Sequence, residues 1–184
     1  MKIVGGELKG RIISTPNIPD LRPSTEKIRE AIFSVLGGDI IGARVGDFFC
    51  GSGALGIEAL SRGAETAFFV DSRRAAVFVV RENLKLLHIA NRGRAMTMNV
   101  FRLRPSHLES IGIIFADPPY RKGHASRLTG LLSLQKFSYN GILVLEHEAE
   151  WRYAGDDFEI LRVIDSGDTG VSFLRGKPEA PEGL

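Results

Sequence analysis

Residues 45–62 read Val-Gly-Asp-Phe-Phe-Cys-Gly-Ser-Gly-Ala-Leu-Gly-Ile-Glu-Ala-Leu-Ser-Arg, and this stretch decides the fold. Its first five residues predict a buried strand, and residues 54–62 predict a helix. Glycines between a strand and a helix let the backbone turn tightly and pass close to a ligand. Gly51, Gly53 and Gly56 fit the spacing G-x-G-x-x-G, a weak signal alone that would also suit a dinucleotide. Close helix–strand packing is an equal alternative for Gly56.

The alternation of strand and helix continues on both sides of this stretch. We expect further strands at residues 66–70, 93–97, 111–116 and 141–146, and helices at residues 24–36, 73–87 and 125–135. Continuous apolar strands that alternate with helices predict an α/β fold with a parallel sheet covered on both faces. Residues 158–164 and 171–175, separated by a turn, predict a closing antiparallel hairpin. Residues 1–16 alternate around glycines and predict a small N-terminal β-hairpin.

The composition predicts one globular domain over residues 1–184, with an N-terminal extension at 1–20 and a flexible tail at 176–184. A content of 43% hydrophobic and 25% charged residues is ordinary for such a domain. The single cysteine, Cys50, excludes an intramolecular disulfide and a cysteine-rich zinc site. The histidines show no metal-binding spacing. No apolar run approaches the ~20 residues of a membrane span, and we expect a cytoplasmic protein.

The net charge of +2 hides a basic segment. Residues 73–104 contain eight basic side chains and one acidic side chain, Glu82. Such a segment could contact a phosphate backbone, and a solvated helix face followed by a loop would explain it equally well.

Acidic residues at the ends of the first two strands narrow the choice of ligand. Asp47 would repel a pyrophosphate but could attract a cationic, amine-bearing ligand. Asp71 lies about 20 residues after the glycines, where an acid can accept both hydroxyls of a ribose; a helix N-cap is its alternative role. Asn99, after the third strand, could bind an adenine edge or form a turn. S-adenosylmethionine satisfies all of these elements.

The tetrapeptide Asp117-Pro118-Pro119-Tyr120 follows the apolar run at 111–116. Two prolines lack N–H donors and fix φ, so nearby carbonyl groups stay free to accept hydrogen bonds. The Asp117 carboxylate and the Pro118 carbonyl can draw the hydrogens of an exocyclic amine out of plane and stabilise its developing charge. Tyr120 offers a face for an unstacked base. The tetrapeptide therefore indicates amine methylation; an ordinary proline turn with a capping Asp is the alternative.

On these motifs the chain resembles the RsmD-like guanine-N2 methyltransferases of bacterial small-subunit ribosomal RNA. This family lies within the Rossmann-like class of S-adenosylmethionine-dependent methyltransferases. The similarity is carried by Ile3-Val4-Gly5-Gly6 and by residues 21–25, 51–64, 117–120 and 167–173. The chain has Ser24 where the family usually has Thr, Cys50 where Ala is common, and Asn99 where the wider class often has Asp.

The resemblance implies a seven-stranded, mostly parallel sheet whose last strand is antiparallel, with an N-terminal β-hairpin. It implies methylation of the N2 of a guanine, conventionally numbered 966, in 16S rRNA within the small ribosomal subunit or an assembly intermediate. It also implies that residues 22–24 lie near the cofactor. No motif indicates oligomerisation, and a monomer without a metal is favoured.

The candidate residues form three sets. The catalytic candidates are Asp117, Pro118, Pro119 and Tyr120. The cofactor-binding candidates are Arg22, Pro23, Ser24, Asp47, Cys50, Gly51, Ser52, Gly53, Asp71, Ser72, Asn99, Val100 and Asp117. The RNA-binding candidates are Lys9, Arg11, Arg121 and Lys122.

Three other functions remain open at this point. Adenine-N6 methylation of DNA or RNA keeps the same chemistry but usually requires a separate recognition domain, for which 184 residues leave little room. A non-catalytic RNA-binding assembly factor would be expected to carry a damaged glycine loop or tetrapeptide, and both are intact. A nicotinamide dehydrogenase is disfavoured by Asp47 and by the two prolines.

Overall fold

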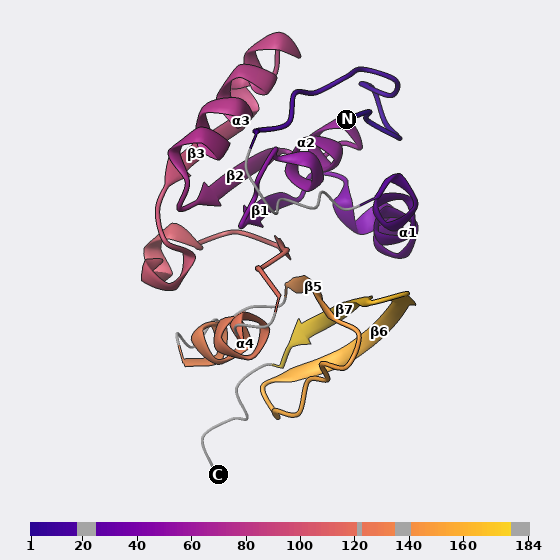
Figure 1. The fold of residues 1–184 in the computed structure, drawn as a ribbon, viewed down its shortest axis with the longest axis vertical. Coiled ribbons are helices and arrows are strands. Elements are labelled where there is room, and N and C mark those ends of the chain that lie inside the picture. The colour runs from indigo at the N-terminus through magenta and orange to yellow at the C-terminus, as the bar shows by residue number, and fades with distance from the viewer. Residues whose placement is uncertain (18–24, 121–122, 135–140, 178–184) are drawn as a thin grey trace.

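A seven-stranded sheet with the order β3-β2-β1-β4-β5-β7-β6 forms the centre of the protein (Figure 1). The computed structural model describes residues 1–17, 25–120, 123–134 and 141–177. The strands are β1 (Arg44–Phe48), β2 (Thr66–Asp71), β3 (Gly93–Thr97), β4 (Ile113–Ala116), β5 (Ile142–Glu148), β6 (Phe158–Ser166) and β7 (Thr169–Gly176). The helices are α1 (Glu26–Leu36), α2 (Ala54–Ser61), α3 (Arg74–Leu86) and α4 (His124–Leu134). Short 3-10 turns are η1 (Gly37–Ile40), η2 (Ala90–Arg92), η3 (Val100–Arg102) and η4 (Pro105–His107). The predicted α-helices and strands are confirmed to within about two residues at each end.

The three central strands end side by side at one edge of the sheet. β1 is parallel to both β2 and β4, and Phe48 is in register with Val70 on one side and Ala116 on the other. The carboxyl ends of parallel strands are where open α/β sheets bind ligands. This register places Asp71 and Asp117 at the same edge as the turn after β1.

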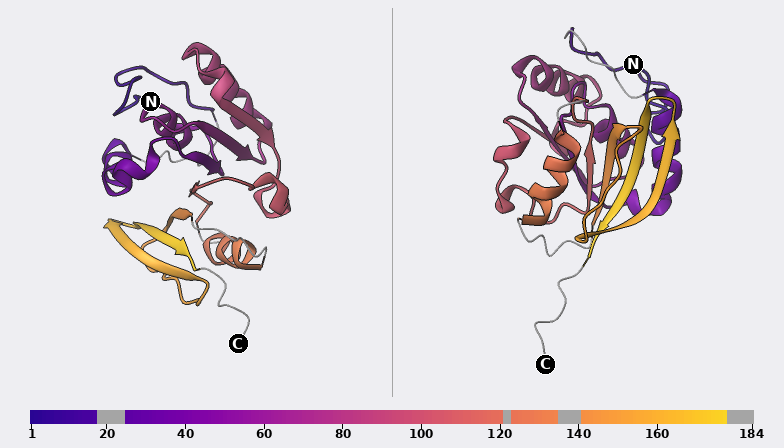
Figure 2. Two further views of the ribbon diagram at one scale, coloured as in Figure 1. Left: turned by 180° about the vertical axis from the view of Figure 1, so that it is seen from behind. Right: turned by 60° about the horizontal axis from the view of Figure 1, so that its bottom comes forward.

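Helices cover both faces of the sheet, as the continuous apolar strands predicted (Figure 2). Apolar side chains of α1, α2 and α3 pack on one face, together with Phe69 and Phe115 of the sheet. α4 packs on the other face, where Phe48 and Ile114 are buried. Neighbouring residues of one strand thus pack into the two apolar clusters on opposite faces of the sheet, since side chains in a strand alternate between faces.

The last strand runs antiparallel to its neighbours, as the sequence predicted. β7 lies between β5 and β6 and pairs antiparallel with both. Gly167, with a φ of 64°, makes the tight turn that joins β6 to β7. Gly176 ends β7, and the Lys177 N–H donates to the Asp157 carbonyl at 2.9 Å. Of the predicted tail at 176–184, Gly176 therefore belongs to β7 and Lys177 is held by a backbone hydrogen bond. Residues 178–184 lie outside the described residues.

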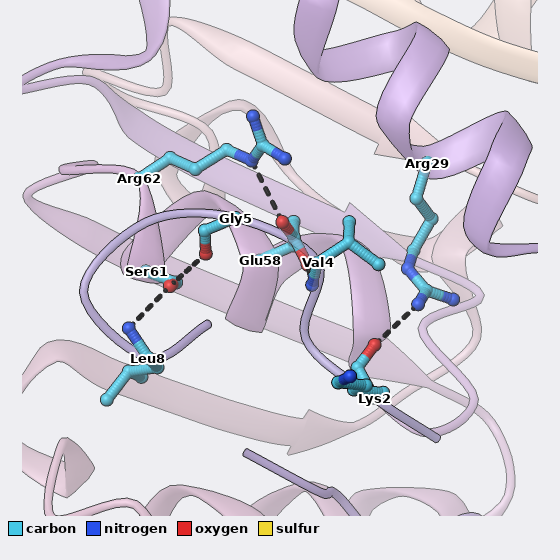
Figure 3. A network of polar contacts seen from close by, with 8 residues as sticks. All are labelled: Lys2, Val4, Gly5, Leu8, Arg29, Glu58, Ser61 and Arg62. Carbon is cyan, nitrogen blue, oxygen red and sulfur yellow. Dashed lines mark hydrogen bonds and ion pairs between the residues drawn. The ribbon is translucent and has the colours of Figure 1, made fainter. Parts of the chain in front are cut away.

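The N-terminal segment forms the expected hairpin in a short form, with an antiparallel bridge and flanking hydrogen bonds in place of regular strands. One antiparallel bridge joins Lys2 to Ile12. Next to the bridge, the Ile3 N–H donates to the Arg11 carbonyl at 3.0 Å and the Ile13 N–H donates to the Met1 carbonyl at 2.8 Å. Backbone groups nearer the turn bind α2 (Figure 3). The Val4 N–H donates to Glu58 Oε2 at 2.9 Å, and the Leu8 N–H donates to Ser61 Oγ at 2.9 Å. Side chains of α2 therefore satisfy donors near the turn, where the bonds between the two arms of the hairpin end.

A buried arginine holds the same segment against α1. Arg29 is 1% exposed, and its Nη2 donates to the Lys2 carbonyl at 2.7 Å. Glu58, which is also 1% exposed, accepts from Arg62 Nε at 2.9 Å (Figure 3). These buried charges tie the first residues of the chain to the two helices that flank β1.

None of the helices in the described part of the chain combines the length and hydropathy that crossing a membrane requires.

Candidate active site

The site begins in the turn between β1 and α2. Gly51 and Gly53 have φ values of 53° and 78°, a conformation that costs glycine little. Gly53 is the N-cap of α2, and its N–H donates to the Cys50 carbonyl at 2.7 Å. The Cys50 N–H donates to the Val70 carbonyl at 3.2 Å, which joins the turn to the end of β2. Cys50 and Ser52 are buried, so the turn presents mainly backbone at the sheet edge.

Gly56 supports the turn from within α2. A Cβ at this position would lie 2.3 Å from Cε1 of Phe69 and 3.1 Å from Cβ of Asp47. The Gly56 N–H donates to Asp47 Oδ2 at 2.9 Å. Of the two roles that the sequence left open for Gly56, close packing of helix against strand is the one found in the structure.

Asp71 ends β2 and binds the residue two positions further along. Its Oδ1 accepts from the backbone N–H and the Nε of Arg73, both at 2.9 Å, and its Oδ2 accepts from Nη2 at 2.8 Å. The Gly51 N–H also donates to Oδ2, at 3.1 Å. Burial alone would raise the pKa of Asp71, but these hydrogen bonds outweigh it and hold the pKa below its ordinary value.

The N-cap role considered for Asp71 is not observed, because the N-cap of α3 is Arg73. A ribose would therefore meet a carboxylate that already binds a guanidinium group. Ser72 lies between these two residues and is exposed.

Four acidic side chains, Asp47, Asp71, Asp117 and Glu146, influence one another's pKa at this edge of the sheet. Burial raises the pKa of Asp47 to about 8, and the charge of Asp71 adds to the effect. Burial also raises the pKa of Asp117 well above its ordinary value, followed in size by repulsion from Glu146 and Asp47. Several carboxyl groups buried close together favour the binding of a cation, because a positive charge reduces the repulsion between them.

The tetrapeptide after β4 presents a carboxyl group and an aromatic ring. Pro118 is buried, Pro119 is exposed, and Asp117 is half-buried. Among the described residues, no hydrogen bond to the Asp117 carboxyl group is found. Tyr120 donates its hydroxyl to Glu146 Oε1 at 3.2 Å, and the same hydroxyl lies 2.9 Å from Thr169 Oγ1. Asp117 is thus available to a substrate, while Tyr120 is anchored to the sheet.

Asn99 lies after β3, near the expected adenine side of the site, but its side chain has a local partner. Its carbonyl oxygen accepts from the Phe101 N–H at 2.9 Å and caps η3. The side chain is exposed, whereas Val100 beside it is buried. The turn role considered for Asn99 is therefore observed, and its adenine contact stays a prediction.

The arrangement suits a cationic adenosine-bearing ligand placed beside an acceptor for an amine. The family described as Conserved hypothetical protein 95, which is the RsmD family, matches residues 1–175. The chain belongs to the RsmD family of methyltransferases.

Individual relatives agree with this assignment. The chain is 38% identical to Ribosomal RNA small subunit methyltransferase D of Buchnera aphidicola, over 79% of this chain and 77% of the relative. It is 35% identical to YlbH of Bacillus subtilis, over 95% of this chain and 98% of the relative. The solved structure of YhhF from Escherichia coli superposes with a TM-score of 0.83 at 30% identity, covering 97% and 99% of the two chains.

Other residues predicted for this RsmD family member fall outside the described site. Lys9 and Arg11 are exposed on the N-terminal segment, and Arg11 Nη2 donates to the Leu86 carbonyl at 3.3 Å. The remaining predicted residues lie outside the described residues; they are Arg22, Pro23, Ser24, Arg121 and Lys122.

Sequence reasoning missed two buried polar residues near the site. Glu146 interrupts the apolar run of β5, and an acid in a buried strand could have indicated its role. Asn83 lies on the buried face of α3, and its amide binds the backbone of Ser14 and the carbonyl of Ser52. An amide at a core position of a helix could have signalled such a contact.

An aromatic cluster next to the site was also missed. The rings of Phe49 and His124 stack with centroids 6.2 Å apart, and Phe101 meets Phe49 edge-on at 5.8 Å. The guanidinium of Arg127 lies 4.0 Å from the Phe101 ring centroid. Phe49 has a φ of 57°, a strained conformation for an aromatic residue. The cluster joins the segments that follow β1, β3 and β4.

No group of side chains suited to a metal ion is found among the described residues.

Proposed function

We propose that this RsmD family member transfers the methyl group of S-adenosylmethionine to the exocyclic N2 of a guanine in small-subunit ribosomal RNA. The observation that carries the proposal is the Asp117 carboxyl group. It follows β4, lacks a hydrogen bond among the described residues, and lies at the sheet edge that also holds the glycine turn and Asp71.

The cofactor side of the proposal rests on the first two strands. The buried Asp47 would pair with the ammonium group of the amino-acid moiety, and Asp71 would accept the ribose hydroxyls. The positive φ of Gly51 and Gly53 allows the backbone to approach the ligand closely. A sulfonium and an ammonium group both suit a region in which burial and mutual repulsion raise the pKa of Asp47 and Asp117.

The chemical step needs a better nucleophile than a planar nucleobase amine. The Asp117 carboxylate and the Pro118 carbonyl would accept the two N–H groups and favour pyramidal nitrogen. The nitrogen lone pair forms a bond to the methyl carbon, and the carbon–sulfur electron pair returns to sulfur. The methylated nitrogen then loses one proton, which Asp117 or water accepts. Tyr120, held in place by Glu146 and Thr169, would stack on the base.

The RNA target comes from the relatives and from the family resemblance. The Buchnera aphidicola relative is named as a small-subunit rRNA methyltransferase. The guanine-966-type position, action on the small subunit or an assembly intermediate, a cytoplasmic location and a monomeric state complete the proposal.

Nucleoside analysis by mass spectrometry tests the proposal directly. Small-subunit rRNA from cells that lack the protein should lose one N2-methylguanosine, and purified protein with S-adenosylmethionine should restore it. Asp117→Asn should bind S-adenosylhomocysteine but lower the methylation rate by about 100-fold or more, as loss of a transition-state acceptor does. Appearance of N6-methyladenosine instead, or full activity of Asp117→Asn, would contradict the proposal.

A further inference from the structure

The connection between β3 and β4 covers its part of the sheet face without an α-helix. In the described structure this connection crosses β2 and β1 with only the 3-10 turns η3 and η4. A groove of about 330 Å³ lies between η4 and the amino ends of the first three strands. Ligand pockets commonly begin at this size. Among the residues that line it are Arg44, Phe68, Asn91, Arg94, Ser106 and His107.

Two arginines in the groove are available to a ligand. Arg44 and Arg94 are exposed, and no hydrogen bond or ion pair of either side chain is found among the described residues. The Arg94 guanidinium lies 5.9 Å from the Phe68 ring centroid. Arg92 differs, because it bonds Glu7 Oε1 at 2.7 Å and two backbone carbonyls.

The polar groups beside these arginines are also donors. Nδ1 of His107 accepts from the Arg104 N–H at 3.0 Å, so the neutral ring carries its proton on Nε2. The amide of Asn91 and the hydroxyl of Ser106 add further donors, and both residues are exposed. Among the described residues, Glu109 is the one acidic residue that lines the groove. A ligand with only acceptor oxygens, such as a phosphate, matches this set.

We infer that this groove binds the phosphodiester backbone of the RNA substrate and anchors it away from the methylated base. The inference rests on the proposed rRNA substrate. The groove lies at the amino end of β1, and Asp117 lies at the opposite edge, about 17 Å away along a five-residue strand. A nucleic acid carries regularly spaced phosphates, so it can reach both places at once. Of the basic segment 73–104, Arg92 and Arg94 line this groove.

The test compares two double variants of equal charge change. Arg44→Gln/Arg94→Gln alters the groove, and Arg162→Gln/Arg175→Gln alters exposed arginines on β6 and β7, at the other end of the sheet. The substrate is small-subunit rRNA from cells lacking the protein. The groove variant should raise KM for rRNA by about tenfold or more, with kcat and the Kd for S-adenosylhomocysteine unchanged. The slope of log affinity against log salt should fall by about 1.4–1.8, as expected for two lost phosphate contacts.

Separate results would overturn the anchor and the proposed function. If wild-type protein methylates rRNA but the groove variant keeps its KM and salt slope, or the control variant loses as much affinity, the anchor is wrong. If wild-type protein methylates no rRNA, the proposed function is wrong. Filter binding of the same RNA to the wild-type and groove-variant proteins then still tests whether the groove binds RNA. Binding of inorganic phosphate that is lost in the groove variant, without any change in RNA affinity, would assign the groove to a small anion instead.

Discussion

Tyr120 donates a hydrogen bond of 3.2 Å to Glu146, and this contact ties the residue after the two prolines to the neighbouring strand β5. The Tyr120 hydroxyl has one proton, so Thr169 on β7 supplies the donor for the second contact, at 2.9 Å. The orientation of the Tyr120 ring therefore depends on two strands far from it in sequence.

The first prediction concerns this anchored ring. Tyr120→Ala should lower kcat for rRNA methylation by about 100-fold, because base stacking is worth roughly 1–3 kcal/mol. Tyr120→Phe keeps the ring but loses both contacts, and it should lower kcat by only about tenfold. Single-turnover assays measure both effects. Thr169→Val removes only the contact with Thr169 and keeps the bond to Glu146, so it should lower kcat by less than Tyr120→Phe does. Equal activity of Tyr120→Ala and wild type would rule out stacking.

The sequence predicted the strand ends of the site because they depend on local patterns. Asp71 and Asp117 close or directly follow an apolar run, Asp47 lies one residue before the end of β1, and parallel strands bring such ends together. The contacts of Glu146 and Asn83 could not be predicted in this way. Glu146 meets Tyr120 across 26 residues, and Asn83 meets Ser14 across 69 residues, so both depend on tertiary packing.

Competition between local partners explains the other differences. Asp71 has the position expected of a ribose acceptor, yet Arg73 can reach back to both of its oxygens. The alternating pattern of the N-terminal segment predicted two paired strands; the pairing forms around one bridge, and Glu58 and Ser61 of α2 take the donors of Val4 and Leu8 nearer the turn. A sequence pattern shows which polar groups need hydrogen-bond partners, but the partner that each group binds depends on the tertiary structure.

The second prediction concerns the proton on Asp47. The pKa of Asp47 is about 8 in the folded protein and ordinarily 3.8, so the folded protein holds a proton that the unfolded chain releases. The stability that Asp47 contributes is complete below pH 4 and is lost as pH rises toward about 8. Asp47→Asn keeps an acceptor for the Gly56 N–H and cannot ionise. Its unliganded form should exceed wild type in unfolding free energy by about 5 kcal/mol at pH 8 and by less than about 1 kcal/mol at pH 4, measured by urea denaturation.

The same proton should affect cofactor binding. An ammonium group pairs with ionised Asp47, so the affinity of wild-type protein for S-adenosylhomocysteine should rise between pH 6 and pH 8, with proton release in calorimetry. Asp47→Asn should bind more weakly at pH 8 and show a flatter pH dependence. Identical pH profiles for the two proteins would show that Asp47 does not meet the ammonium group.

The third prediction uses two glycines in helices as a matched pair. Gly56→Ala should destabilise the protein by about 1–3 kcal/mol, because the new methyl group would overlap the buried ring of Phe69. Gly130 lies in α4, and no atom lies within 4 Å of the place that a Cβ would take there. Gly130→Ala should therefore be neutral or stabilise by up to ~1 kcal/mol through helix propensity. Thermal unfolding separates the two. A Gly56→Ala protein as stable as Gly130→Ala would mean that α2 and β2 pack less closely than the structure indicates.

The fourth prediction concerns Asn83, which joins the N-terminal segment to the glycine turn. Its Oδ1 accepts from the Ser14 N–H at 2.8 Å, and its Nδ2 donates to the Ser14 carbonyl at 2.9 Å and to the Ser52 carbonyl at 3.2 Å. Asn83→Ala should cost about 2–4 kcal/mol of stability, because it leaves buried backbone groups without partners. It should also weaken binding of S-adenosylhomocysteine, since Ser52 belongs to the glycine turn.

Ser14→Ala is the control for this prediction, because the bonds between Ser14 and Asn83 involve only the Ser14 backbone. It should stay within about 0.5 kcal/mol of wild type, as exposed substitutions usually do. Urea denaturation and calorimetry with S-adenosylhomocysteine give both quantities for each variant. A stable Asn83→Ala protein with unchanged affinity would show that the N-terminal segment and the glycine turn are independent. Reduced stability with unchanged affinity would limit Asn83 to holding the segment in place, because binding then would not depend on the contact with Ser52.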